Sequence, residues 1–158
     1  MVSQGFGYKL GVDLPGEKRG LIPNAQFYDK AYRGHWNGLT VISISIGQGE
    51  ILSTPLQIAN LGATIANRGH FTTPHIVKEI QDAQLDSIYR HPRNTTIERR
   101  HYESVVEGMR AAATGGTCRM LSVMVPELEA CGKTGTAQNR GQNQGEKKGR
   151  NRSQESRH

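Results

Sequence analysis

The sequence has no long hydrophobic run and few aromatic residues. Its 158 residues contain nothing close to the roughly 18 consecutive apolar residues that a transmembrane helix needs. No apolar signal-peptide core follows Met1. Only 35% of the residues are hydrophobic and 6% are aromatic, which is low for a packed domain. The length fits one domain, and no membrane anchor is predicted within it.

Cysteine is scarce, and its spacing excludes the usual structural metal sites. Cys118 and Cys131 form no Cys-x-x-Cys pair, and no matched histidine pair accompanies them. The six histidines are scattered along the chain. We therefore predict no metal site and no cofactor. Two free, buried thiols are expected, with a disulfide as the alternative in an oxidising compartment.

Hydrophobic residues are absent from the C-terminal segment 140–158. Without any Ala, Val, Ile, Leu, Met, Phe, Trp, Tyr or Cys, it cannot bury enough apolar surface to offset its ordering entropy. We predict a folded portion over residues 1–139 and a disordered tail over 140–158. Six Lys or Arg against two Glu give the tail most of the net charge of +6.

The basic tail suggests one alternative function. Sequence-independent charge attraction to nucleic acid or anionic surfaces would make the chain a non-catalytic interaction protein. The simpler interpretation is a solvated terminus with no binding role. No specific nucleic-acid recognition is predicted.

Local signals predict two helices. Thr54 is a capable N-cap, Pro55 fits the first helical position, and Gln57 can reach back to complete a capping box. This helix is expected to end at residue 67 or 68, with Gly69 as a left-handed stop. A second helix is predicted over 98–113. The stripes expected to face the core are Ile58, Leu61 and Ile65 in the first helix, and Tyr102, Val105, Val106, Met109, Ala112 and Ala113 in the second.

The remaining segments carry weaker patterns. Residues 4–38 are rich in Gly and Pro and are expected to be irregular, with Trp36 and the tyrosines packing as anchors. The β-branched, partly alternating run 39–46 is expected to be a short strand or an extended entry to the first helix. Strand structure is also predicted over 70–80, interrupted by Pro74.

The run from Cys131 to Gln138 is the most informative part of the sequence. Residues 133–135 read Lys-Thr-Gly, one of three signatures of the serine acyl-transferases that penicillin inhibits. The other two, Ser-x-x-Lys and a Ser-x-Asn triplet, are absent from the 158 residues. A Walker A phosphate loop is excluded, because that motif needs a glycine where Glu127 stands.

Two upstream segments strengthen this interpretation, because they resemble blocks of the class B penicillin-binding proteins. Residues 6–17 are similar to the stretch that follows the family's Ser-x-Asn motif. Residues 45–60, with their Gly-Gln-Gly and Thr-Pro-Leu-Gln, are similar to another family block. The order and spacing of all three blocks match elongation-type members, and the resemblance covers residues 4–139.

The resemblance implies an α+β fold: part of the penicillin-binding transpeptidase (serine β-lactamase-like) fold, with helices packed on an antiparallel sheet. It implies a D,D-transpeptidase that cross-links peptidoglycan stem peptides by serine acyl transfer and binds β-lactams. The membrane-embedded elongation machinery would be its partner. The parent protein would lie at the periplasmic face of the bacterial inner membrane, with its anchor upstream of this chain.

The resemblance also implies roles for four residues on a strand at the edge of the active site. Lys133 would place a cation beside the nucleophile and the substrate. Thr134 would donate to the terminal carboxylate of a stem peptide, and Gly135 would let the substrate backbone lie against the strand. The N–H of Thr136 would form half of an oxyanion hole. Lys133 and Thr136 are the predicted catalytic residues; Thr134 and Gly135 are the predicted substrate-binding residues.

Two departures from the family pattern lead to further expectations. Acyl transfer needs the missing serine, so we expect the chain to be inactive by itself. The abrupt polar change after Asn139 indicates a truncated or frameshifted reading frame. A Lys133 strand without its downstream neighbour would leave a sheet edge unpaired, which predicts marginal stability.

Overall fold

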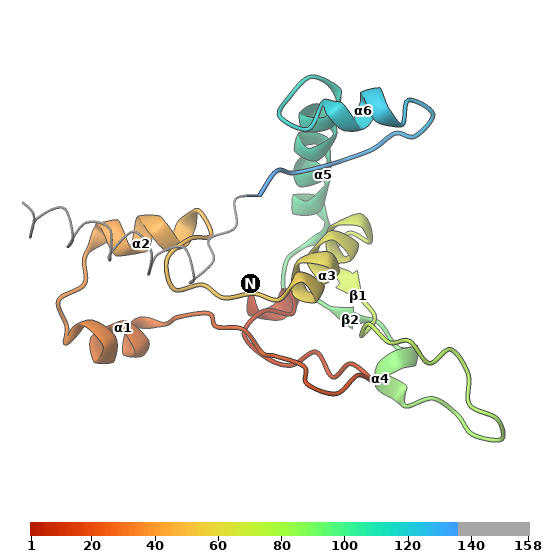
Figure 1. Ribbon diagram of the computed structural model, residues 1–158, viewed down its shortest axis with the longest axis horizontal. Coiled ribbons are helices and arrows are strands. Elements are labelled where there is room, and N and C mark those ends of the chain that lie inside the picture. Colours follow the sequence, from red (N-terminus) through yellow and green to blue (C-terminus); the bar gives the residue numbers. More distant parts are fainter. Residues whose placement is uncertain (136–158) are drawn as a thin grey trace, which may run out of the picture.

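The computed structural model describes residues 1–135, and Figure 1 shows their arrangement. The predicted boundary at 139 and the predicted tail over 140–158 lie outside this part of the chain. Helices dominate and the one sheet is small and antiparallel, which confirms the α+β class. The elements in chain order are η1 (Val2–Gln4), α1 (Ala25–Tyr32), α2 (Gly38–Ser45), α3 (Pro55–Ala66), β1 (His70–Phe71), α4 (Ser87–Arg90), β2 (Arg93–Asn94), α5 (Arg99–Thr114) and α6 (Met120–Met124).

Helix α3 begins and ends at the signals that predict it. Thr54 Oγ1 accepts a hydrogen bond from the Gln57 backbone N–H (3.2 Å), and Gln57 Oε1 accepts one from the Thr54 N–H (2.9 Å). This reciprocal pair is a capping box. Arg68 and Gly69 follow the helix with φ of 59° and 107°. The predicted capping box and the left-handed glycine stop are confirmed.

The buried face of α3 is polar, which makes the prediction of an apolar stripe wrong. The side chains of Gln57, Asn60 and Thr64 are at most 4% exposed. They are satisfied by backbone groups: Thr64 Oγ1, for example, donates to the Asn60 carbonyl at 2.7 Å. Hydrophobic periodicity cannot detect a face that binds loops through hydrogen bonds. The residues of the predicted stripe are exposed or half-buried: Ile58, Leu61 and Ile65.

A small core lies where α3 meets the sheet and α5. Strands β1 and β2 pair antiparallel, with Phe71 opposite Arg93. The Arg93 guanidinium lies 5.4 Å from the ring centroids of both Tyr8 and Phe71, within cation–π range. The buried apolar side chains of this core are Phe6, Leu10, Phe71 and Tyr102, while Ala113 is buried near the far end of α5, next to α6. The predicted strand over 70–80 forms at its first two residues only, since Pro74 lacks the N–H that would continue the ladder.

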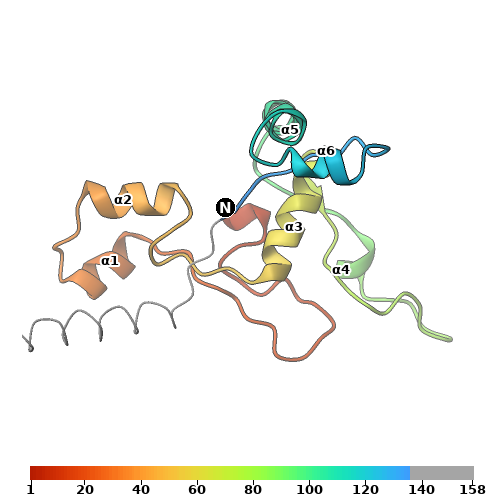
Figure 2. The same cartoon turned by 45° about the horizontal axis from the view of Figure 1, so that its top comes forward.

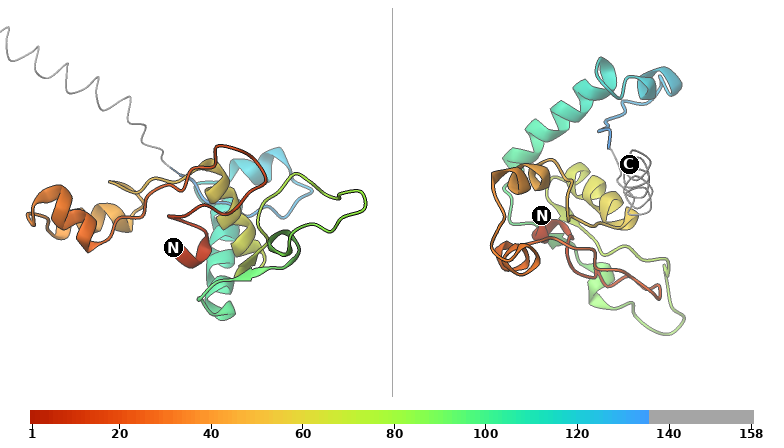
Figure 3. Two further views of the ribbon diagram at one scale, coloured as in Figure 1. Left: turned by 90° about the horizontal axis from the view of Figure 1, so that it is seen from below. Right: turned by 60° about the vertical axis from the view of Figure 1, so that its left-hand side comes forward.

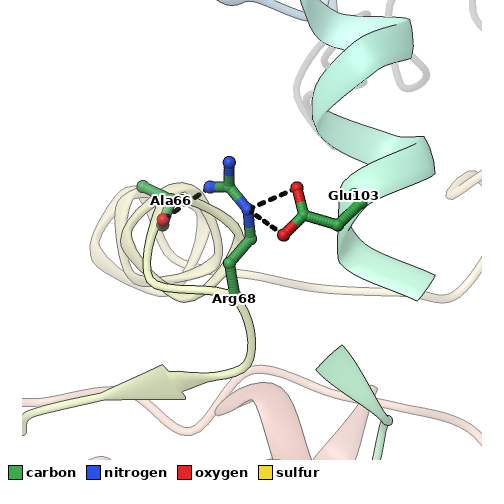
Figure 4. A network of polar contacts seen from close by, with 3 residues as sticks. All are labelled: Ala66, Arg68 and Glu103. Atoms are coloured by element: carbon green, nitrogen blue, oxygen red, sulfur yellow. Dashed lines mark hydrogen bonds and ion pairs between the residues drawn. The ribbon is translucent and has the colours of Figure 1, made fainter. Parts of the chain in front are cut away.

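Helix α5 confirms the second predicted helix and packs against α3 and α6. Tyr102 and Ala113 are buried, as predicted, whereas Val105 is 45% exposed. Figure 4 shows Arg68, just after α3, with its Nε 3.1 Å from both carboxylate oxygens of Glu103 on α5. The same guanidinium donates to the Ala66 carbonyl at 2.7 Å. This ion pair joins the end of α3 to the first turns of α5.

Helices α1 and α2 form an arm that projects to one side of the other elements (Figures 1, 2 and 3). Both correct the sequence predictions, because residues 25–32 were expected to be irregular and 39–46 extended. Asn24 and Asn37 explain the difference, since each side chain accepts from a backbone N–H of the following turn. No strand of the described chain lies next to residues 39–46. The backbone N–H and C=O groups of this segment therefore pair with one another within a helix.

Candidate active site

The segment that carries Lys-Thr-Gly follows α6 and runs back beside the end of α5 (Figures 1 and 2). The Gly132 N–H donates to the Met109 carbonyl of α5 at 3.1 Å. A Cβ on Gly132 would lie 2.8 Å from Leu121 Cδ1 and 3.4 Å from Cys118 Sγ, so only glycine fits here without displacement. The residue before Lys133 is therefore fixed against the α5–α6 turn.

Lys133, Thr134 and Gly135 extend beyond that attachment and are exposed. Lys133 Nζ donates to the Thr134 carbonyl at 2.8 Å, and it has no carboxylate partner among residues 1–135. Apart from its chain neighbours, no atom of residues 1–135 lies within 4 Å of a Cβ built on Gly135. Residues 133–135 belong to no strand within residues 1–135, so the expected strand at Lys133 is not formed there, because no neighbouring strand of the described chain pairs with it. Predicted residue Thr136 lies outside the described residues.

The opening block, residues 6–17, is held by polar contacts rather than by regular structure. The Glu17 carboxylate accepts from the N–H groups of Leu10, Gly11 and Val12 at 2.6, 3.1 and 3.3 Å. Three N–H groups converging on one carboxylate make the loop a small closed turn.

Asp13 links the same block to the segment after β1. Its Oδ2 accepts from the N–H groups of Val77 and Ile76 at 2.8 Å each. These two bonds hold the pKa of Asp13 below its ordinary value, with the bond from Val77 having the larger effect. Burial acts in the opposite direction. Asp13 is therefore a charged acceptor at neutral pH.

Gln57 joins the opening block to the Thr-Pro-Leu-Gln helix. Its Nε2 lies within hydrogen-bond distance of the carbonyl oxygens of Gly5 (3.1 Å), Tyr8 (3.2 Å) and Arg19 (3.1 Å). The backbone at Gly20 passes so close to residue 52 that a Cβ built on Gly20 would lie 2.3 Å from the Leu52 carbonyl oxygen. Two of the three blocks that resemble the family are thus one connected unit around a buried amide.

Sequence reasoning missed Glu50, which follows Gly-Gln-Gly. Its carboxylate accepts the O–H of Tyr28 at 2.8 Å and the O–H of Tyr32. These bonds span 22 and 18 residues, so no local pattern could have revealed them. The predicted packing of Trp36 with the tyrosines is confirmed, with Trp36 and Tyr28 centroids 5.8 Å apart.

The cysteines are free, as predicted, but they are not buried. Cys118 is half-buried and Cys131 is exposed. Within the described part of the chain, no group of three or more His, Cys, Asp or Glu is placed to hold a metal ion. No helix of residues 1–135 is long and apolar enough to cross a membrane.

The curated proteins similar to this chain include peptidoglycan D,D-transpeptidases and a penicillin-binding protein 2A. The chain is 37% identical over 139 residues to the peptidoglycan D,D-transpeptidase MrdA of Acinetobacter baumannii, covering 85% of this chain and 20% of that protein. It is 32% identical over 139 residues to the MrdA of Haemophilus influenzae, covering 85% of this chain and 21% of that protein. The chain thus spans about a fifth of the length of these relatives.

Solved structures give the same result. The chain matches PBP2 of Pseudomonas aeruginosa in complex with WCK 5153 (TM-score 0.67, 31% identity), covering 77% of this chain and 28% of that one. It matches PBP2 of Helicobacter pylori in its complex with MreC (TM-score 0.59, 28% identity), covering 72% and 20%. A chain of a peptidoglycan synthase complex that couples polymerization and crosslinking matches with TM-score 0.70 and 34% identity, covering 87% and 22%.

The family model described as the penicillin-binding protein transpeptidase domain matches residues 1–154. The match takes in both upstream blocks and Lys-Thr-Gly, and it extends past residue 139, where the predicted boundary stays a prediction. With the sequence relatives and the fold in agreement, this chain belongs to the penicillin-binding transpeptidase family, and its relatives are peptidoglycan D,D-transpeptidases of the PBP2 type.

Proposed function

We propose that this chain supplies the Lys-Thr-Gly wall of a serine D,D-transpeptidase active site. The observation that carries the proposal is the exposed run of residues 133–135, placed in family order after the two upstream blocks. Gly132 is fixed against α5, whereas no side chain or loop of residues 1–135 covers the Cα of Gly135. Such a segment leaves a backbone edge free for an extended peptide to pair with.

Each residue of the wall has a distinct role in this proposal. The Lys133 ammonium attracts the carboxylate end of a D-Ala-D-Ala stem peptide and assists proton transfer at the nucleophile. The Thr134 hydroxyl donates to that carboxylate, or to the carboxylate of a β-lactam. Gly135 admits the substrate backbone, and the N–H of Thr136 stabilises the oxyanion. The nucleophile is a serine that residues 1–158 do not contain in a Ser-x-x-Lys motif.

Partners and location follow from the relatives as part of the proposal. The Helicobacter pylori relative binds MreC, and another relative works in a peptidoglycan synthase complex. We propose that the protein to which this chain corresponds acts with elongation machinery at the periplasmic face of the inner membrane. Its substrates there are peptidoglycan stem peptides, and β-lactams bind as their mimics.

A fluorescent penicillin tests the role of the chain. The purified 158-residue chain is expected to take no covalent label, because it lacks the acylated serine. Adding the upstream part of a relative's transpeptidase domain, with its Ser-x-x-Lys and Ser-x-Asn motifs, should produce label on that added part. Label on the 158-residue chain alone would sink the claim that it is inactive by itself.

A further inference from the structure

The arm formed by α1 and α2 is attached to the other elements at few points. Figures 1 and 3 show it projecting away from α3, α5 and the sheet. At its base, Leu21 and Leu52 exchange two backbone hydrogen bonds of 2.7 and 2.9 Å. Farther out, Glu50 joins the two legs of the arm, because its carboxylate, in the segment after α2, accepts the O–H groups of both tyrosines of α1.

Tyr28 is the centre of the arm's packing. It is 3% exposed, and its ring centroid lies 5.8 Å from those of Tyr32 and Trp36 and 5.5 Å from that of Phe27. One carboxylate, that of Glu50, therefore binds the most buried side chain of the arm and its neighbour together. A charged acceptor at such a position strengthens both hydrogen bonds.

We propose that Glu50, Tyr28 and Tyr32 form an acid-sensitive latch, which holds α1 against the Gly47–Glu50 turn and releases α1 from that turn when Glu50 takes up a proton. An ionised carboxylate accepts from two hydroxyls at once. After protonation, two phenol donors meet a carboxyl group that carries a hydrogen of its own and no charge. The latch therefore weakens at the step where the proton binds.

The direction of the pH effect follows from the same contacts. The hydrogen bonds from Tyr32 and Tyr28 hold the pKa of Glu50 below its ordinary value of 4.5, with burial opposing them. A lowered pKa in the folded state stabilises that state fully above the ordinary value, and the stabilisation is lost as the pH falls through the lower folded pKa. Acid therefore opens the latch.

At alkaline pH, the two tyrosines of the latch determine its stability, and their pKa values shift in the opposite direction from that of Glu50. Burial and the hydrogen bond to Glu50 raise the pKa of Tyr28 from 10.0 to about 12. The bond to Glu50, together with burial, also raises the pKa of Tyr32. A raised pKa stabilises the folded state below the ordinary value, and this stabilisation is lost as the pH climbs towards about 12. The latch stays closed across neutral pH.

Other ionisable groups of the arm could also respond to acid, and control variants have to separate their effects from that of Glu50. Asp29 on α1 accepts from Trp36 Nε1 at 2.8 Å, so its protonation is a second way to disturb the aromatic cluster. Lys30, Arg33 and His35 lie on α1 and in the turn after it, and none of them makes an ion pair with Glu50 in the described chain. Between residues 38 and 53, Glu50 is the one ionisable side chain.

Trp36 is the single tryptophan of the chain, so its fluorescence reports the arm. In the full 158-residue chain, Trp36 emission and far-UV circular dichroism would be recorded together from about pH 7 to about pH 3. The latch predicts a change in emission centred below pH 4.5, before the helical signal falls. Coincident curves would overturn the latch, because the arm would then open only with the whole fold.

Two matched variants show which carboxyl group causes the acid-induced change in Trp36 emission. Glu50→Gln keeps the size of the side chain but cannot titrate, so the acid change in Trp36 emission should vanish. Asp29→Asn removes the other carboxylate that contacts the cluster and should leave the change in place. The reverse pattern would assign the transition to Asp29 and overturn the proposal.

Tyr32→Phe provides a second test in case Glu50→Gln fails to fold. Tyr32 is 42% exposed, so the loss of its hydroxyl group is expected to leave the fold intact. Losing its hydrogen bond should raise the acid midpoint of Trp36 emission towards 4.5, the ordinary pKa of Glu50. An unchanged midpoint in a folded Tyr32→Phe chain would also count against the latch.

Discussion

At the residue scale, single polar side chains connect the loops of the family blocks. Glu17 closes residues 10–12, and Gln57 joins residues 5–19 to α3. The loops have little regular structure to satisfy their backbone groups, so buried side-chain amides and carboxylates do so instead. These residues are therefore expected to carry more stability than an ordinary polar residue.

Gln57 provides the first prediction. Gln57→Leu removes an amide that faces three carbonyl oxygens and should lower the free energy of unfolding by about 3 kcal/mol. Gln57→Glu should destabilise at neutral pH too, because a carboxylate would face the same oxygens, and acid should restore part of the loss. Urea unfolding measures both, with Gln26→Glu on the exposed side of α1 as control. A Gln57→Leu chain as stable as the parent would contradict the role of this amide.

Gly20 provides the second prediction. Both Gly20 and Gly16 have positive φ (65° and 81°), but only at Gly20 would a Cβ meet an atom, the Leu52 carbonyl oxygen. Gly16→Ala should cost about 1 kcal/mol through backbone strain alone. Gly20→Ala should cost at least about twice as much, because it also breaks the Leu21–Leu52 bridge. Equal unfolding midpoints for the two variants would rule out the close approach at Gly20.

At this scale, the sequence proposes site residues only where a motif marks them. Lys133, Thr134 and Gly135 are proposed because three consecutive residue types match the motif, and their roles stay a prediction. Glu50 has no such mark, since its partners are 18 and 22 residues away and meet it only after α1 has folded. The polar contacts of Gln57 are hidden for the same reason.

At the element scale, α3 was predicted from its capping box and α5 from its periodic apolar residues, whereas α1 and α2 were not predicted although each has an Asn cap. Helix α3 has a capping box and a glycine stop, so its limits follow from adjacent residues. Helix α2 consists mainly of β-branched and apolar residues, which favour a strand in isolation. Its helical state depends on the Asn37 cap and on the lack of a neighbouring strand in residues 1–135. Propensity alone misses that context.

Arg68 provides the prediction at this scale. It has a φ of 59°, which costs a non-glycine residue about 1 kcal/mol, and its exposed pairing with Glu103 offsets little of this cost. Arg68→Ala keeps the strain and loses the pairing, so it should destabilise. Arg68→Gly loses the pairing but relieves the strain, and should be about 1 kcal/mol more stable than Arg68→Ala. Thermal unfolding compares the two variants, and a glycine variant no more stable than the alanine variant would contradict the backbone strain at residue 68.

At the scale of the whole molecule, large apolar side chains remain exposed on several helices. Leu39 of α2, Ile58 of α3, and Val123 and Met124 of α6 are 57% to 74% exposed. Leu39, Val41 and Ile42 are exposed together on α2, and apolar surface gathered in this way usually contacts another part of a protein or a partner. The chain also spans about a fifth of its curated relatives. The isolated chain is therefore still predicted to be marginally stable, and a cooperative thermal transition near that of an ordinary domain would count against this prediction.

The most direct test of the account is the acylation rate of a chimera. Residues 1–139 would replace the matching segment of the Acinetobacter baumannii relative, which supplies the remaining motifs, and labelling by a fluorescent penicillin would be timed. The account predicts that the chimera is labelled and that Lys133→Ala slows labelling by about 100-fold or more, whereas Lys30→Ala on the exposed side of α1 has no effect. Equal labelling of the Lys133→Ala chimera and its parent would contradict the placement of Lys133 in the active site.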